Sequence, residues 1–167
     1  MRWRTRAAAP EVAVGPGERV LAWCRSSDDR VLAGTRDALY LATLDDTTRI
    51  PWEQVEAADW DSDTEVLRVS LVGSWGEQRV EHVLAIAEPG RLLQLVRERV
   101  TASIVLQRHV PLRGRGGVRV IGRRAPRGDA PIAWFYEYDE GVDPDDPTVR
   151  TAAAEALVAA RSDVGLG

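Results

Sequence analysis

The feature that most constrains this chain is a series of short apolar segments between polar turns, which ends where the apolar period changes. Between residues 19 and 86, candidate strands recur at intervals of about 8–12 residues. From residue 90 to residue 103, apolar side chains recur instead at helical spacing. An isolated helix of about 14 residues is marginal in water. This order therefore predicts an antiparallel sheet followed by a helix whose apolar stripe packs on it.

Seven strands are expected in this first part, because each apolar run is bounded by residues that favour turns. They cover residues 20–25, 30–35, 38–43, 49–52, 55–61, 65–71 and 78–86. Pro51 restricts its strand to a sheet edge or a strand start, since proline donates no hydrogen bond to a ladder. The regular spacing favours a sandwich or a barrel.

The rest of the chain predicts a three-stranded meander and a final helix. Its strands are expected at residues 104–112, 118–124 and 132–138. Asp146 suits the N-cap of the helix, Pro147 its first position, and Gly165 its end. Side chains 132, 134, 136 and 138 share one face of their strand. We expect the helix to cover this aromatic face.

These patterns predict an α+β fold of mostly antiparallel strands. Residues 1–17 would form an irregular N-terminal arm, 18–103 a first domain, and 104–167 a meander-plus-helix extension packed on that domain. The apolar runs are too short for a transmembrane helix. The single cysteine, Cys24, cannot form an intrachain disulfide and suits a reducing cytoplasm.

Three segments resemble the bacterial PH-like group, which includes the GRAM and bacterial PH domains. They are Ala-Leu-Tyr-Leu at 38–41, Arg-Ile-Pro-Trp-Glu-Gln-Val at 49–55, and the apolar helix at 92–100. The resemblance covers residues 18–103 and implies a seven-stranded sandwich or barrel with a capping helix. It also implies a scaffold that binds proteins or lipids and rarely catalyses a reaction.

Phosphoinositide binding is not expected of this chain. In the group that it resembles, phosphoinositide-binding members use basic residues in the loop between the first two strands. Here Arg25 and Arg30 stand at the edges of that loop, but Asp28 and Asp29 lie inside it. Two carboxylates would repel a phosphorylated head group at close range.

The strongest charge anomaly lies between residues 101 and 128, which hold seven arginines and His109 but no acidic residue. Guanidinium groups bind phosphate and carboxylate through paired hydrogen bonds. The arginines could instead pair inside the fold with the acidic residues that follow Asp129. The net charge of −4 and the lack of stacking aromatics among these arginines argue against nucleic acid. The candidate anion- or partner-binding residues are Arg113, Arg115, Arg119, Arg123 and Arg124.

Trp75 is a further candidate, because it lies in the glycine-bounded loop 73–76. An exposed tryptophan on a loop can anchor a partner, or it can fold back over the sheet edge. Four others should be core or half-buried residues of strands. They are Trp23, Trp52, Trp60 and Trp134.

Catalytic residues, a metal site and a cofactor are not expected. His82, His109 and Cys24 cannot form a structural zinc site without carboxylates. Hydrolase, metalloprotease and dinucleotide-binding motifs are absent from the sequence. A thiol–imidazole pair would require the fold to bring Cys24 to a histidine.

The sequence therefore favours a non-enzymatic, PH-like interaction module that mediates protein–protein association in the cytoplasm. Its partner would be another protein, held by an exposed sheet edge, by Trp75 or by the arginine-rich meander. The alternative is the binding of an anionic ligand (nucleic acid, a nucleotide or a membrane surface) through residues 108–127.

Overall fold

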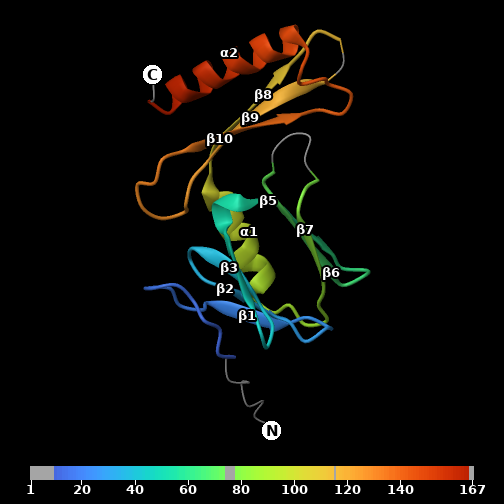
Figure 1. The fold of residues 1–167 in the computed structure, drawn as a ribbon, viewed down its shortest axis with the longest axis vertical. Coiled ribbons are helices and arrows are strands. Elements are labelled where there is room, and N and C mark those ends of the chain that lie inside the picture. Colours follow the sequence, from blue (N-terminus) through green and yellow to red (C-terminus); the bar gives the residue numbers. More distant parts are fainter. Residues whose placement is uncertain (1–9, 74–77, 115, 166–167) are drawn as a thin grey trace. The chain divides into compact units, whose positions relative to one another are not determined.

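The computed structural model describes residues 10–73, 78–114 and 116–165 (Figure 1). The chain divides into two compact units, Met1–Thr101 and Ala102–Gly167. The expected α+β class with mostly antiparallel strands is confirmed, because the described residues form three antiparallel sheets and two α-helices. Neither of these helices combines the length and the apolar character that a bilayer span requires.

The first unit begins with a four-stranded antiparallel meander. Its strands lie side by side in chain order: β1 (Ala22–Arg25), β2 (Val31–Gly34), β3 (Ala38–Ala42) and β4 (Thr47–Pro51). Pro51 ends β4, an edge strand of this sheet, as expected of a residue without an amide proton.

Trp52 departs from its predicted place in a strand, because the chain turns into the short 3-10 helix η1 (Trp52–Gln54). The turn places the indole in the core, where it is fully buried. Its Nε1 donates a hydrogen bond to the Thr35 carbonyl at 3.0 Å. This bond satisfies the one polar group of the buried ring.

A three-stranded sheet and a helix complete the unit. The strands β5 (Val55–Asp61), β6 (Val66–Leu71) and β7 (Glu81–Ala85) pair in that order, and α1 (Leu92–Ser103) follows them. Among the described residues the seven strands pair as two separate sheets and do not close into a barrel. Leucine and valine side chains from both sheets and α1 share one core, which includes Leu39, Val69 and Leu92.

Gly34 explains how α1 approaches the end of β2. A Cβ atom built at this position would lie 2.5 Å from Leu95 Cδ2 and 3.4 Å from Leu92 Cδ1. Glycine therefore lets two leucines of the helix lie against the strand backbone.

The central strands of the first sheet are buried on both faces. Their inner face enters the shared core, whereas Ala33, Ala38 and Tyr40 form a second cluster. Val12, Val14, Val20 and Trp23 pack on that second cluster. Residues 10–20, which belong to no helix or strand, thus cover the outer face of the sheet.

The second unit is a three-stranded meander with one helix on it. The strand order is β10 (Ala133–Tyr138), β9 (Gly117–Arg123), β8 (Ile104–Pro111), and α2 (Pro147–Asp163) packs on β9 and β8 (Figure 1). The predicted cap is confirmed, since the Asp146 side chain accepts a hydrogen bond from the Thr148 amide at 2.8 Å. Ala156 and Ala160 lie against Val120 of β9.

The expected cover of the aromatic face is only partial. Trp134 packs against the cluster beneath α2, but Tyr136 remains 40% exposed. The cover is partial because α2 packs mainly on β8 and β9, whereas β10 is the edge strand on the other side of β9.

Candidate functional site

The candidate arginines occupy different environments along β9. Arg113 is exposed in the turn before this strand, and Arg124 is exposed just after it. Arg119 is half-buried, while Arg123 is only 3% exposed. The structure therefore places Arg113 and Arg124 at opposite ends of β9. Arg115 and Trp75 lie outside the described residues.

Basic side chains of the meander form ion pairs with acidic residues later in the chain. Arg119 lies 3.7 Å from Glu137, its register partner on β10. Arg108 pairs with Asp163 at the end of α2. His109 Nε2 lies 2.9 Å from Asp139, and this contact lowers the pKa of the Asp139 carboxyl. At Arg108 and Arg119, the positive charge is balanced within the unit.

In the turn between β1 and β2, the Asp28 carboxylate forms an ion pair with Arg30. Arg30 lies 2.9 Å from Asp28 and also donates to the Val83 carbonyl at 3.3 Å. The Arg30 side chain, helped by the Ser26 hydroxyl, lowers the pKa of Asp28 to about 2. A phosphate at this turn would meet a carboxylate that is ionised throughout the neutral range.

The cysteine and the two histidines, which were the candidates for catalysis, have different environments. Cys24 is buried in the core, and burial raises its thiol pKa to about 11. Burial, together with the nearby Arg30 charge, lowers the pKa of His82. His109 is bound to Asp139 on the other unit. In the part of the chain that the structure describes, no three His, Cys, Asp or Glu side chains cluster as metal ligands would.

A groove of about 390 Å³ lies between β5 and α1 in the first unit. Trp60 and its cross-strand partner Leu67 line the sheet side. Leu93 and Val100 line the helix side, and both are partly buried on the core beneath. The groove therefore has an apolar floor that is continuous with the core.

Charges of opposite sign border this groove. Exposed Arg97 contributes to the helix wall, and exposed Asp59 contributes to the strand wall. The acidic character continues from β5 into the turn that follows, at Asp61, Asp63 and Glu65, which are all exposed. Because α1 and β5 are far apart in sequence, local patterns did not predict the groove.

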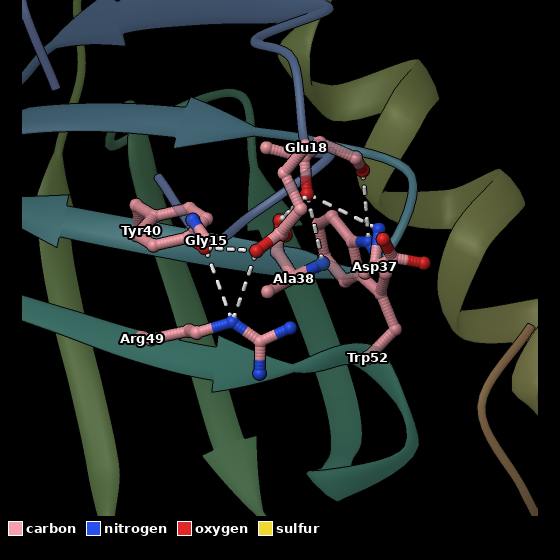
Figure 2. A network of polar contacts seen from close by, with 8 residues as sticks. Gly15, Glu18, Asp37, Ala38, Tyr40, Arg49 and Trp52 are labelled. Atoms are coloured by element: carbon pink, nitrogen blue, oxygen red, sulfur yellow. Dashed lines mark hydrogen bonds and ion pairs between the residues drawn. The ribbon is translucent and has the colours of Figure 1, made fainter. Parts of the chain in front are cut away.

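A buried carboxylate ties the N-terminal segment to the first sheet (Figure 2). The Glu18 side chain is 4% exposed. Its Oε1 accepts a hydrogen bond from the Thr35 hydroxyl at 2.6 Å, and its Oε2 accepts one from the Tyr40 hydroxyl at 2.5 Å. Arg49 Nε lies 3.3 Å from the same Oε2.

The donors around Glu18 decide its protonation state. Burial by itself raises the pKa of this carboxyl, but hydrogen bonds from Thr35, Tyr40 and Arg49 outweigh it and lower the pKa. Glu18 is thus ionised at neutral pH. Burial and the bond to Glu18 raise the pKa of Tyr40, which keeps its hydroxyl a donor.

Comparisons of the chain with models of protein families, with curated proteins and with solved structures found no match.

Proposed function

We propose that this chain is a non-enzymatic, PH-like interaction module that associates with another protein through the groove between β5 and α1. The groove is the observation that carries the proposal, because it joins an apolar floor to charged walls on one unit. Seven antiparallel strands and then a helix follow one another in the first unit, and the PH-like resemblance implies seven strands with a capping helix. This order supports the choice of scaffold.

The proposed occupant is an extended segment of the partner with apolar and basic side chains. An apolar side chain would rest on Trp60, Leu93 and Val100 and exclude water from them. Basic side chains would face Asp59 and the acidic turn after β5. Arg97 on the helix wall would repel a basic residue of the partner. The basic residues of the bound segment should therefore lie on the side of β5, which would fix the orientation of the segment in the groove.

Strand pairing would supply the remaining affinity. Among the described strands, β5 pairs with β6 alone and forms one edge of its sheet. Such an edge can accept a further strand through main-chain hydrogen bonds, while pockets beside it select side chains.

A catalytic role is not part of this proposal. Cys24, the one thiol of the chain, is a buried group whose pKa near 11 keeps it protonated at neutral pH. A cytoplasmic location fits the free thiol, and the charge pairs of the meander favour a protein partner over an anionic ligand.

Selection of peptides from a random display library on the full chain tests the proposal. We expect enriched peptides to combine aliphatic or aromatic residues with arginine or lysine. Leu93→Asp should abolish their binding, because it places a charge on the apolar floor. Failure to enrich any apolar and basic peptide whose binding Leu93→Asp abolishes would contradict the proposal.

Gln94→Asp is the matched control for this variant. It introduces the same charge on the neighbouring position of α1, where the side chain is exposed and lines no part of this groove. Its peptide binding should equal that of the unmodified chain.

A further inference from the structure

We propose that Thr35, Tyr40 and Arg49 form a carboxylate-binding site that Glu18 occupies within the same chain. An acidic, extended segment of a partner protein would take this site by displacing residues 10–20. The site lies on the outer face of the first sheet and is independent of the groove proposed above.

The three donors belong to the sheet and not to the segment that fills their site. Thr35 directly follows β2, Tyr40 lies in β3 and Arg49 lies in β4. Tyr40 and Arg49 are register partners, and Arg49 Nε donates to the Tyr40 hydroxyl at 3.1 Å. Because the sheet holds these side chains, their arrangement would persist after residues 10–20 leave.

Side-chain contacts, more than a backbone ladder, hold residues 10–20 on the sheet. The Gly15 amide donates to the Tyr40 hydroxyl at 2.9 Å. The first backbone hydrogen bond of the β-sheet kind comes only after this segment, where the Leu21 amide donates to the Gly34 carbonyl at 2.8 Å. Val12 and Val14 are only half-buried. The segment can therefore detach without breaking a strand pair of the sheet.

Arg49 offers an incoming carboxylate a first contact. Its side chain is 44% exposed, and its hydrogen bonds to described residues run through Nε. The two terminal guanidinium nitrogens can bind a second carboxylate before Glu18 departs. Displacement can thus proceed stepwise, as one carboxylate replaces another on the same arginine.

The segment in place indicates which sequence fits the site. Val12 and Val14 precede Gly15, and Glu18 follows three residues later. A Cβ atom at Gly15 would lie 2.2 Å from Glu18 Oε2, so a side chain there would crowd the carboxylate. A competing segment should therefore carry aliphatic residues, then glycine, then a carboxylate at the same spacing.

Fluorescence anisotropy with a labelled peptide of residues 10–20 tests this inference on the full chain. The attached segment has an effective concentration in the millimolar range, so the unmodified chain should bind the peptide weakly. Glu18→Gln in the chain weakens the attached segment and should tighten peptide binding at least tenfold. A peptide that itself carries Glu18→Gln should bind this variant no more tightly than it binds the unmodified chain.

A second variant keeps the test decisive if Glu18→Gln prevents folding. Val14→Asp in the chain loosens the segment and leaves Thr35, Tyr40 and Arg49 unchanged. Peptide binding to neither variant, or equal binding of the peptides with and without Glu18, would overturn the inference. The groove variant Leu93→Asp should leave this binding unchanged, which separates the site from the proposed function.

Discussion

Tyr40 and Arg49 face each other across β3 and β4, and both hold the carboxylate of a residue that precedes the sheet. This relationship explains why β3 is buried on both faces, although only one face of its sheet packs on the main hydrophobic core. A polar contact at the centre of the outer face fixes the segment whose valines cover that face.

Glu18→Gln should reduce the free energy of unfolding at neutral pH by about 1–3 kcal/mol, since buried donors would lose a charged acceptor. The pKa of Glu18 is lowered in the folded state, so its contribution is present above the ordinary carboxyl pKa. That contribution is lost as the pH falls through the lowered value. Urea unfolding at neutral pH and at successively lower pH should show the two proteins converge in acid.

Glu81→Gln is the control for this measurement. Its carboxylate lies 2.8 Å from Arg68, but both side chains are well exposed, and such pairs contribute about 0–1 kcal/mol. An effect of Glu18→Gln no larger than that of Glu81→Gln would show that the buried network adds no stability.

Trp52→Phe should destabilise the first unit although the ring stays apolar. The change leaves the Thr35 carbonyl without its indole donor and removes part of a fully buried side chain. We expect a loss of about 1–3 kcal/mol for Phe and about 3–5 kcal/mol for Ala. Denaturant unfolding followed by circular dichroism measures both, and a Phe variant as stable as the unmodified chain would contradict a role for the hydrogen bond.

The Cys24 thiol should resist a thiol-specific disulfide reagent in the folded protein at pH 8. With a pKa of about 11, very little thiolate forms at that pH, and burial also blocks the approach of the reagent. In denaturant the thiol should react at once and in full. Rapid stoichiometric labelling of the native chain would contradict this burial and the proposal that the chain is non-enzymatic.

The arginine-rich meander should bind heparin resin weakly, with elution at or below about 0.15 M salt. Arg108 and Arg119 are paired with carboxylates, and the exposed Arg113 and Arg124 stand at opposite ends of β9. Retention at far higher salt that Arg113→Ala and Arg124→Ala together remove would favour the anionic-ligand alternative.

Local patterns predicted most of the secondary structure. Alternating apolar residues located the strands, and the Asp146–Pro147 pair located the start of α2. These signals act over a few residues, so they need no knowledge of the tertiary fold. The class of fold followed from their order along the chain.

The sequence did not reveal contacts between distant segments. Val12 and Val14 lie in a short stretch that carries no strand or helix pattern of its own, so their packing on Tyr40 had no local signal. Trp52 follows a strand-like run, and its turn out of the strand buries the indole in the core and pairs it with Thr35, a residue distant in sequence. The groove between β5 and α1 likewise depends on tertiary packing.

Backbone amide chemical shifts of the full chain, recorded as a selected peptide is added, report directly on whether the peptide binds in the groove between β5 and α1. We expect the largest shifts at Asp59 and Trp60 of β5 and at Leu93, Arg97 and Val100 of α1. Shifts confined to the β8–β10 sheet, with β5 and α1 unchanged, would contradict binding in this groove.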